Sequence, residues 1–154
     1  MLDKNTMKGE NKNKYIDIRE RKEMSDLNDK LNGFVNTADH TEEFDAADIQ
    51  SNKVMAVLAY LGILILIPVF AARNSKFVRF HVNQSLALWV VAMVVSVILS
   101  ILGKVPLIGK AASFVSSGIS IVEFILCVLG ILNACNGKAK ELPIVGGIKL
   151  LNNR

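Results

Sequence analysis

Long apolar runs dominate the chain from residue 53 onward. Residues 54–72 form nineteen consecutive positions without a charged side chain, and two more apolar runs cover residues 82–102 and 112–133. An α-helix needs about 20 apolar residues to cross the hydrocarbon core of a bilayer. Three such runs leave almost no amphipathic helix that could build a soluble shell around them. The pattern therefore predicts an all-α integral membrane protein, with a bundle of three transmembrane helices in a membrane domain over residues 53–154.

Residues 1–52 have a different pattern, which predicts a soluble, partly disordered tail. Residues 1–14 are polar and rich in Lys and Asn, as disordered segments often are. Residues 15–35 place apolar side chains on or near one stripe among many charges, which predicts one amphipathic helix. The stripe is formed by Ile16, Met24, Leu27, Leu31 and Phe34. Two interpretations stay open: a surface for docking or self-association, or a solvated helix with little order.

An acidic connector over residues 39–48 leads into the first apolar run. It lacks the alternating acids, the central Gly and the closing Glu of a calcium-binding EF-hand loop, so we expect no metal there. Asp45 or Asp48 is placed to cap the helix that follows, because acidic charge is favourable at a helix amino terminus.

The linker between the first two runs has the pattern of a helix lying at the membrane interface. Arg73, Lys76 and Arg79 recur every three residues and share one helical face, while Phe77 and Phe80 can turn toward the acyl chains. The segment after Lys140 also leans apolar, but Pro143 and two glycines interrupt it. It is too short to cross a membrane, so we expect it to lie at the interface or to re-enter against the bundle.

Charge is divided as sharply as hydropathy. Residues 1–52 carry eight basic and twelve acidic side chains, whereas residues 53–154 carry ten basic and two acidic ones. The basic side chains stand at the ends of the apolar runs, where anionic lipid headgroups attract them. They lack the aromatic platform or groove-reading helix of a nucleic-acid-binding protein. The lipid bilayer, and not nucleic acid, is therefore their predicted partner, with headgroup contacts from Arg73, Lys76, Arg79, Lys138 and Lys140.

Polar side chains gather at one predicted face of the membrane. With three spans, the end of the third lies on the same side as the linker before the second, so polar side chains at these two places have a similar depth. The candidate cluster consists of His81, Asn83, Gln84, Asn133 and Asn136. We expect these side chains to satisfy one another and to act structurally, because a lone His near a helix end is more often a hydrogen-bonded group than a catalyst.

Glu123 is a second candidate, near the middle of the third run. A charge at that depth costs a few kcal/mol or more unless it is paired, protonated or facing water. Two interpretations stay open. In the first, Glu123 has a function, as an ion or proton site or as a contact between protomers. In the second, it is a neutral side chain hydrogen-bonded to Ser120 or to a neighbouring helix.

The sequence carries no catalytic or cofactor-binding motif. It has no Gly-rich phosphate loop, no GxSxG, no HExxH and no paired intramembrane aspartates. Cys127 and Cys135 stand without a CxxC spacing or a His partner that would suggest a metal site. We therefore expect neither enzymatic activity nor a cofactor.

Several sequence blocks resemble a family of small bacterial membrane proteins. The blocks are residues 41–45, residues 52–60, the series Arg79-Phe80-His81 with Asn83-Gln84, and residues 136–143, which read NGKAKELP. Proteins of this group are often labelled as similar to the small membrane subunit of the chloroplast inner-envelope protein-import machinery. The resemblance covers the chain from about residue 40 onward and implies a multi-span membrane protein, without implying a reaction.

The leading functional hypothesis is a non-enzymatic interaction or assembly protein, whose bundle anchors the soluble segment in the bacterial cytoplasmic membrane. Its expected partner is another protein or a second copy of the chain. The alternative is an oligomeric channel or a translocation-related component that uses Glu123 within the bundle. An intramembrane enzyme is disfavoured by the missing motifs.

The basic residues also bear on orientation. Under the three-span interpretation, the positive-inside rule places the first linker and the carboxyl terminus in the cytoplasm and the amino terminus outside. A second possibility is that Gly62 and Pro68 let the first run form a re-entrant hairpin, which leaves both termini inside.

Overall fold

The computed structural model describes the backbone of residues 4–105 and 109–151, and side chains from residue 16 onward. Within these ranges all regular elements are helical, which confirms the all-α prediction. The chain divides into two compact units, residues 1–36 and residues 37–154. The acidic connector therefore belongs to the same unit as the apolar runs.

The first unit contains a single helix, α1 (Lys4–Val35). It begins well before residue 15, so residues 4–14, for which the sequence pattern favoured disorder, are helical here. The pairs Arg19–Glu23 and Asp17–Arg21 are in contact at 2.9 and 3.1 Å, one helical turn apart. Such exposed pairs add only a few tenths of a kcal/mol each.

The expected span over residues 54–72 is not a single helix. Helix α2 (Ala46–Leu58) stops inside the run, and a 3₁₀ turn, η2 (Gly62–Ile65), leads into the short α3 (Leu66–Ala71). Gly62 has a φ of 63°, which residues with a side chain rarely adopt and which an α-helix cannot contain. None of these pieces is long enough to cross a bilayer. The prediction of three transmembrane helices is therefore not confirmed.

Two helices do have the length and composition of membrane spans: α4 (Lys76–Leu102) and α5 (Gly109–Cys135). In the most apolar window of each, only 17% and 11% of the residues are buried within the protein. The core helix of a soluble protein would be mostly buried. These helices instead present apolar side chains outward, as spans facing lipid do.

The predicted interfacial linker is incorporated into α4. The helix begins at Lys76, where the hydroxyl of Ser75 accepts a hydrogen bond from the main-chain N–H of Val78. The side chain of Phe77 is fully buried and that of Phe80 is half-buried. The expectation that both rings face acyl chains is wrong for Phe77, because the first turns of α4 pack against α2.

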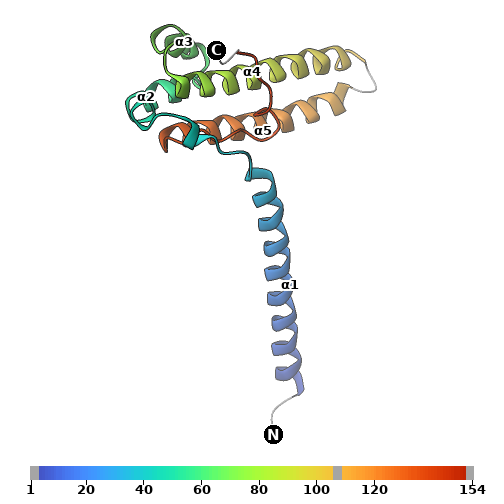
Figure 1. The fold of residues 1–154 in the computed structure, drawn as a ribbon. Helices are drawn as coiled ribbons and strands as arrows, with labels where there is room; N and C mark the ends of the chain where they lie inside the picture. The colour runs from blue at the N-terminus through green and yellow to red at the C-terminus, as the bar shows by residue number, and fades with distance from the viewer. Residues whose placement is uncertain (1–3, 106–108, 152–154) are drawn as a thin grey trace. The chain divides into compact units, whose positions relative to one another are not determined.

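The buried core lies at one end of the α4–α5 pair. Figure 1 shows α4 and α5 side by side, with α2 and α3 gathered at the end where α4 begins. Small side chains allow the close packing there, since Ala56 of α2 and Ala134 of α5 are both fully buried. Gly130 of α5 faces Tyr60, and a Cβ atom at Gly130 would lie 2.3 Å from the phenol ring. The core therefore depends on Gly130 having no side chain.

Candidate functional site: a polar junction at one end of the hairpin

The first three turns of α4 hold an unusual number of buried polar side chains. His81, Gln84 and Ser85 are almost completely buried, and Asn83 is 9% exposed. Asp48 of α2 fixes the beginning of this helix, because its carboxylate accepts a hydrogen bond from the main-chain N–H of Phe77 at 3.1 Å. Buried polar groups are costly unless they are paired, so their partners define what this region does.

Gln84 and Asn83 hydrogen-bond to the main chain of the carboxyl-terminal segment, residues 136–151. Gln84 donates to the carbonyl of Lys140 at 3.2 Å and accepts from the N–H of Leu142 at 2.7 Å. Asn83 donates to the carbonyl of Ile148 at 2.9 Å. Its side-chain oxygen accepts from the N–H groups of Leu150 and Leu151 at 2.6 and 2.8 Å. The two amides thus supply the partners that a segment without regular structure cannot supply for itself.

The segment that precedes α2 also hydrogen-bonds to the carboxyl-terminal segment. The N–H of His40 donates to the carbonyl of Ala139, and the N–H of Glu141 donates to the carbonyl of Ala38, both at 2.9 Å. Asp39 and Lys140 form an isolated antiparallel bridge. The hydroxyl of Thr41 accepts from the N–H of Ala139 at 2.9 Å. We call this arrangement the polar junction: residues 37–41, residues 138–151 and the side chains of Asn83, Gln84 and Asn133.

His81, in the second turn of α4, is fully buried next to the polar junction. Its Nδ1 atom is 3.1 Å from the hydroxyl of Tyr60. Its ring packs edge to face against Phe77, with centroids 4.7 Å apart. Its Nε2 atom is buried and makes no hydrogen bond within the described part of the chain. His81 therefore ties the end of the broken first run to α4.

His40 occupies the outer edge of the polar junction, between two carboxylates. Its Nδ1 lies 2.6 Å from Glu43, and its Nε2 lies 3.1 Å from Glu141. The contact with Glu43, and secondarily that with Glu141, raises the pKa of His40 above its usual value, against an opposing effect of burial. Hydrogen bonds from Thr41 lower the pKa of Asp39. Protonated His40 thus bridges the segment before α2 and the carboxyl-terminal segment.

The structure brings together most of the predicted cluster, but through a different set of bonds. Gln84 and Asn133 both donate to the carbonyl of Lys140, at 3.2 and 3.5 Å. Asn136 is exposed at the end of α5. The predicted side chains do not bond to one another; main-chain groups of the carboxyl-terminal segment lie between them. Sequence reasoning missed Thr41, His40 and Tyr60, although Thr41 and Tyr60 stand in the blocks that carried the family resemblance.

The predicted headgroup contacts surround the end of the α4–α5 pair at which α4 begins. Arg73, Lys76 and Lys138 are exposed, and Arg79 and Lys140 are half-buried. Glu123 is half-buried on α5, away from the polar junction. Its proposed partner Ser120 instead donates to the carbonyl of Ser116 at 3.1 Å.

The polar junction can hold backbone in place, but it offers little chemistry. Among the described residues, no group of three or more His, Cys, Asp or Glu side chains is arranged to hold a metal ion. The two nitrogens of His40 already face separate carboxylates. The arrangement is typical of a structural clasp that closes two distant segments onto the start of a membrane helix.

Known proteins are similar to the chain over most of its second unit. It is 35% identical over 94 residues to the magnetosome protein MamF of Paramagnetospirillum magneticum, a match that covers 60% of this chain and 78% of the relative. It is 30% identical over 96 residues to the magnetosome protein MmsF of the same organism, covering 62% and 82%. A UPF0132 membrane protein of Methanocaldococcus jannaschii is 34% identical over 94 residues, covering 60% and 63%. No solved structure gives a significant match.

These relatives support a membrane location and a membrane-associated role. One of them is named as a membrane protein, and the structure adds two helices of spanning length. The comparisons give no support to the resemblance to a chloroplast import subunit, and that part of the sequence interpretation is withdrawn. The model of the magnetosome magnetite crystal formation protein family matches residues 51–151, which include α4, α5 and most of the polar junction, and the chain belongs to that family.

Proposed function

We propose that this protein is a non-enzymatic assembly component of the bacterial cytoplasmic membrane. Helices α4 and α5 insert as a hairpin of two membrane spans. The polar junction closes the end of this hairpin at which α4 begins and α5 ends. Helix α1 then acts as the assembly element by pairing with α1 of a second copy. The family description and the names MamF and MmsF connect relatives with magnetosomes. For this chain we infer assembly within a membrane, and not iron binding.

The observation that carries the proposal is the exposed apolar stripe of α1. Met24, Leu27, Leu31 and Phe34 follow one another at spacings of three, four and three residues, and are 61, 56, 50 and 42% exposed. This spacing is that of the apolar seam of a two-helix coiled coil. An exposed stripe of this kind marks an interaction surface.

A second copy fits this stripe better than an unrelated globular partner does. The seam covers only two heptads, which is short for a coiled coil in dilute solution. Insertion of the hairpin confines copies to one membrane and so raises their effective concentration, which allows a short seam to pair. The mixed charges around the stripe, including the Arg19–Glu23 pair, suit pairing with an identical helix.

Covalent cross-linking of the full chain in membranes tests the proposal. Leu27→Glu and Leu31→Glu should reduce the cross-linked dimer at least tenfold at unchanged membrane abundance, because each buries a charge in the seam. Ser25→Glu, on the opposite face of α1, is the matched control and should leave the dimer unchanged. Equal dimer in all variants would contradict the proposal.

The alternative of an oligomeric channel rests on Glu123, whose side chain is half-buried within a candidate span. Ion flux through vesicles that contain the purified protein tests it. The assembly proposal predicts no flux above that of empty vesicles and normal behaviour of Glu123→Gln. Flux that Glu123→Gln abolishes would favour the channel.

A further inference from the structure

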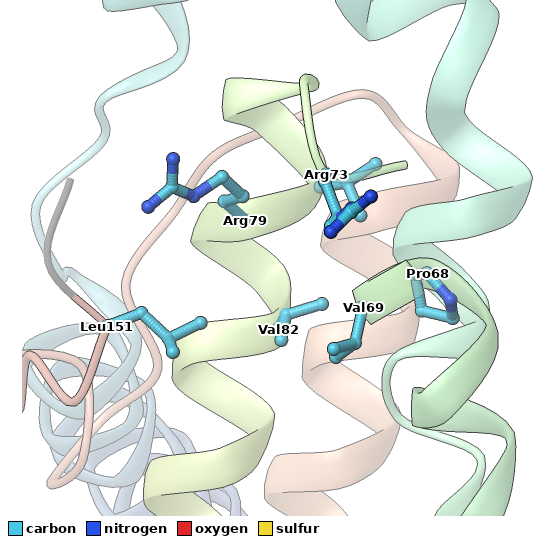
Figure 2. Close-up of a pocket in the computed structure, with 7 residues that line it drawn as sticks. Pro68, Val69, Arg73, Arg79, Val82 and Leu151 are labelled. Atoms are coloured by element: carbon cyan, nitrogen blue, oxygen red, sulfur yellow. The ribbon is translucent and has the colours of Figure 1, made fainter. Parts of the chain in front are cut away.

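A cavity of about 280 Å³ opens between α3, the first turns of α4 and the carboxyl-terminal segment. Five of its seven lining side chains are apolar and the other two are arginines. The lining residues are Pro68, Val69, Arg73, Val78, Arg79, Val82 and Leu151. Figure 2 shows Arg73 and Arg79 on one side, with Val69, Val82 and Leu151 across the space from them.

We propose that this cavity is a binding site for an acidic phospholipid. In this assignment Arg73 binds the phosphate, Arg79 adds positive charge to the same side of the cavity, and the apolar walls take the first methylene groups of an acyl chain. The assignment depends on the proposed membrane insertion and is independent of α1 pairing.

Charge complementarity selects a phosphate-bearing ligand. A guanidinium presents a planar fork of N–H donors that matches phosphate oxygens better than an ammonium does. Residues 53–154 carry ten basic side chains against two acidic ones, although Asp48 of α2 also lies at the beginning of α4. An anion is therefore attracted here from the membrane surface.

The apolar walls select a lipid over free phosphate. Pro68, Val78 and Val82 form the buried base of the cavity, whereas Val69 and Leu151 are half-buried and still expose apolar surface. A bare phosphate would leave Val69 and Leu151 in contact with water, whereas the first methylene groups of an acyl chain would cover them. The cavity lies at the beginning of a candidate span, the depth at which headgroups meet hydrocarbon.

The polar junction supports one wall of this site. The N–H of Leu151 donates to Asn83 at 2.8 Å, which holds the Leu151 side chain in the lining. The buried amide of Asn83 thus acts as a positioning residue for the cavity. A carboxyl-terminal segment released from Asn83 would open the cavity on that side.

Lipid binding to the full chain in detergent micelles tests the proposal. Short-chain phosphatidylglycerol should raise the melting temperature saturably, whereas short-chain phosphatidylcholine and inorganic phosphate at the same concentration should have at most a tenth of that effect. Arg73→Gln, and Val69→Phe, which fills the cavity without removing charge, should each weaken phosphatidylglycerol binding at least tenfold. Lys104→Gln is the matched control, since Lys104 is exposed just beyond the end of α4 and does not line the cavity.

The outcomes separate the alternatives. Arg79 has a further interaction within the protein. The lipid binding of Arg79→Gln is therefore interpreted only if its melting temperature without lipid equals that of the parent. If the two melting temperatures differ, Arg73→Gln and Val69→Phe decide the test. An equal effect of inorganic phosphate would replace the lipid by a free anion and overturn the proposal. Equal losses in Lys104→Gln would show diffuse surface attraction, which also overturns it. Leu27→Glu should abolish dimerisation without changing lipid binding, so the two proposals fail separately.

Discussion

The hydroxyl of Tyr60 lies 3.1 Å from Nδ1 of His81, in an interior where both side chains are at most 3% exposed. Tyr60 follows the last turn of α2, and His81 stands in the second turn of α4. The contact therefore joins the break in the first apolar run to the start of the first candidate span. Helix α2 ends at Leu58, just before Tyr60, whose hydroxyl lies against the buried imidazole.

This contact predicts coupled effects on stability. Tyr60→Phe and His81→Phe should each lower the free energy of unfolding by about 1–3 kcal/mol, because each leaves a buried polar partner unpaired. The double variant should lose less than the sum of the two, since the same hydrogen bond cannot be lost twice. Chemical denaturation in detergent measures all three. Strict additivity would show that the two side chains do not interact.

Gln84 should be essential to the polar junction. Gln84→Ala leaves the N–H of Leu142 without its side-chain partner and the carbonyl of Lys140 with only the 3.5 Å contact from Asn133, and Leu142 is only 2% exposed. We expect a loss of about 2 kcal/mol or more and faster proteolysis of residues 136–151. Gln50→Ala, on an exposed position of α2, should change neither. A protease pattern identical to that of the parent would argue against the clasp.

Gly130 and Gly118 form a matched pair on α5. A Cβ atom at Gly130 would lie 2.3 Å from the ring of Tyr60, whereas at Gly118 it would meet nothing within 4 Å. Gly130→Ala should therefore destabilise the protein by about 1–3 kcal/mol through overpacking. Gly118→Ala should be neutral or stabilise it by up to about 1 kcal/mol, since Ala is the better helix former. Thermal unfolding compares them, and equal melting temperatures would contradict the observed packing.

His40 should make stability depend on pH. Its pKa is raised in the folded state, first by Glu43 and then by Glu141, so folding favours the protonated form. That contribution is fully present below the ordinary histidine pKa of about 6.5 and is lost as the pH rises through the raised pKa. The melting temperature of the parent should therefore fall between about pH 6 and pH 8 relative to that of His40→Gln. A parallel dependence in both proteins would show that His40 contributes nothing.

The apolar runs of the sequence predicted the two long helices but not the division of the first run. The runs over residues 82–102 and 112–133 lie within α4 and α5, because an uninterrupted apolar run of this length favours one long helix. The first run failed the same reasoning. Its length and its lack of charge are those of a span, but a positive φ at Gly62 and a buried partner for Tyr60 divide it. Both depend on tertiary contacts that a hydropathy pattern does not contain.

The sequence predicted which side chains lie in the candidate site better than it predicted their hydrogen-bond partners. Asn83 and Gln84 stood out as polar residues at the start of an apolar helix, and both are buried in the structure. Their partners are main-chain groups of residues 140–151. Such partners carry no residue-type signal, since every residue has a main-chain carbonyl. The sequence analysis expected this segment at the interface or against the bundle, and the structure shows it hydrogen-bonded to α4.

Site-directed labelling tests the central claim most directly, namely that α4 and α5 alone cross the membrane. Single cysteines at Glu42, Lys104 and Lys149, in a chain with Cys127 and Cys135 replaced by Ser, are treated with a membrane-impermeant reagent in intact cells and in inverted vesicles. Residues 37–41 bond to residues 138–141, so the two-span hairpin predicts that Glu42 and Lys149 react from the same side and Lys104 from the opposite side. From the positive-inside rule we expect Glu42 and Lys149 to lie in the cytoplasm. Reaction of Glu42 and Lys149 from opposite sides would restore the three-span bundle and contradict this account.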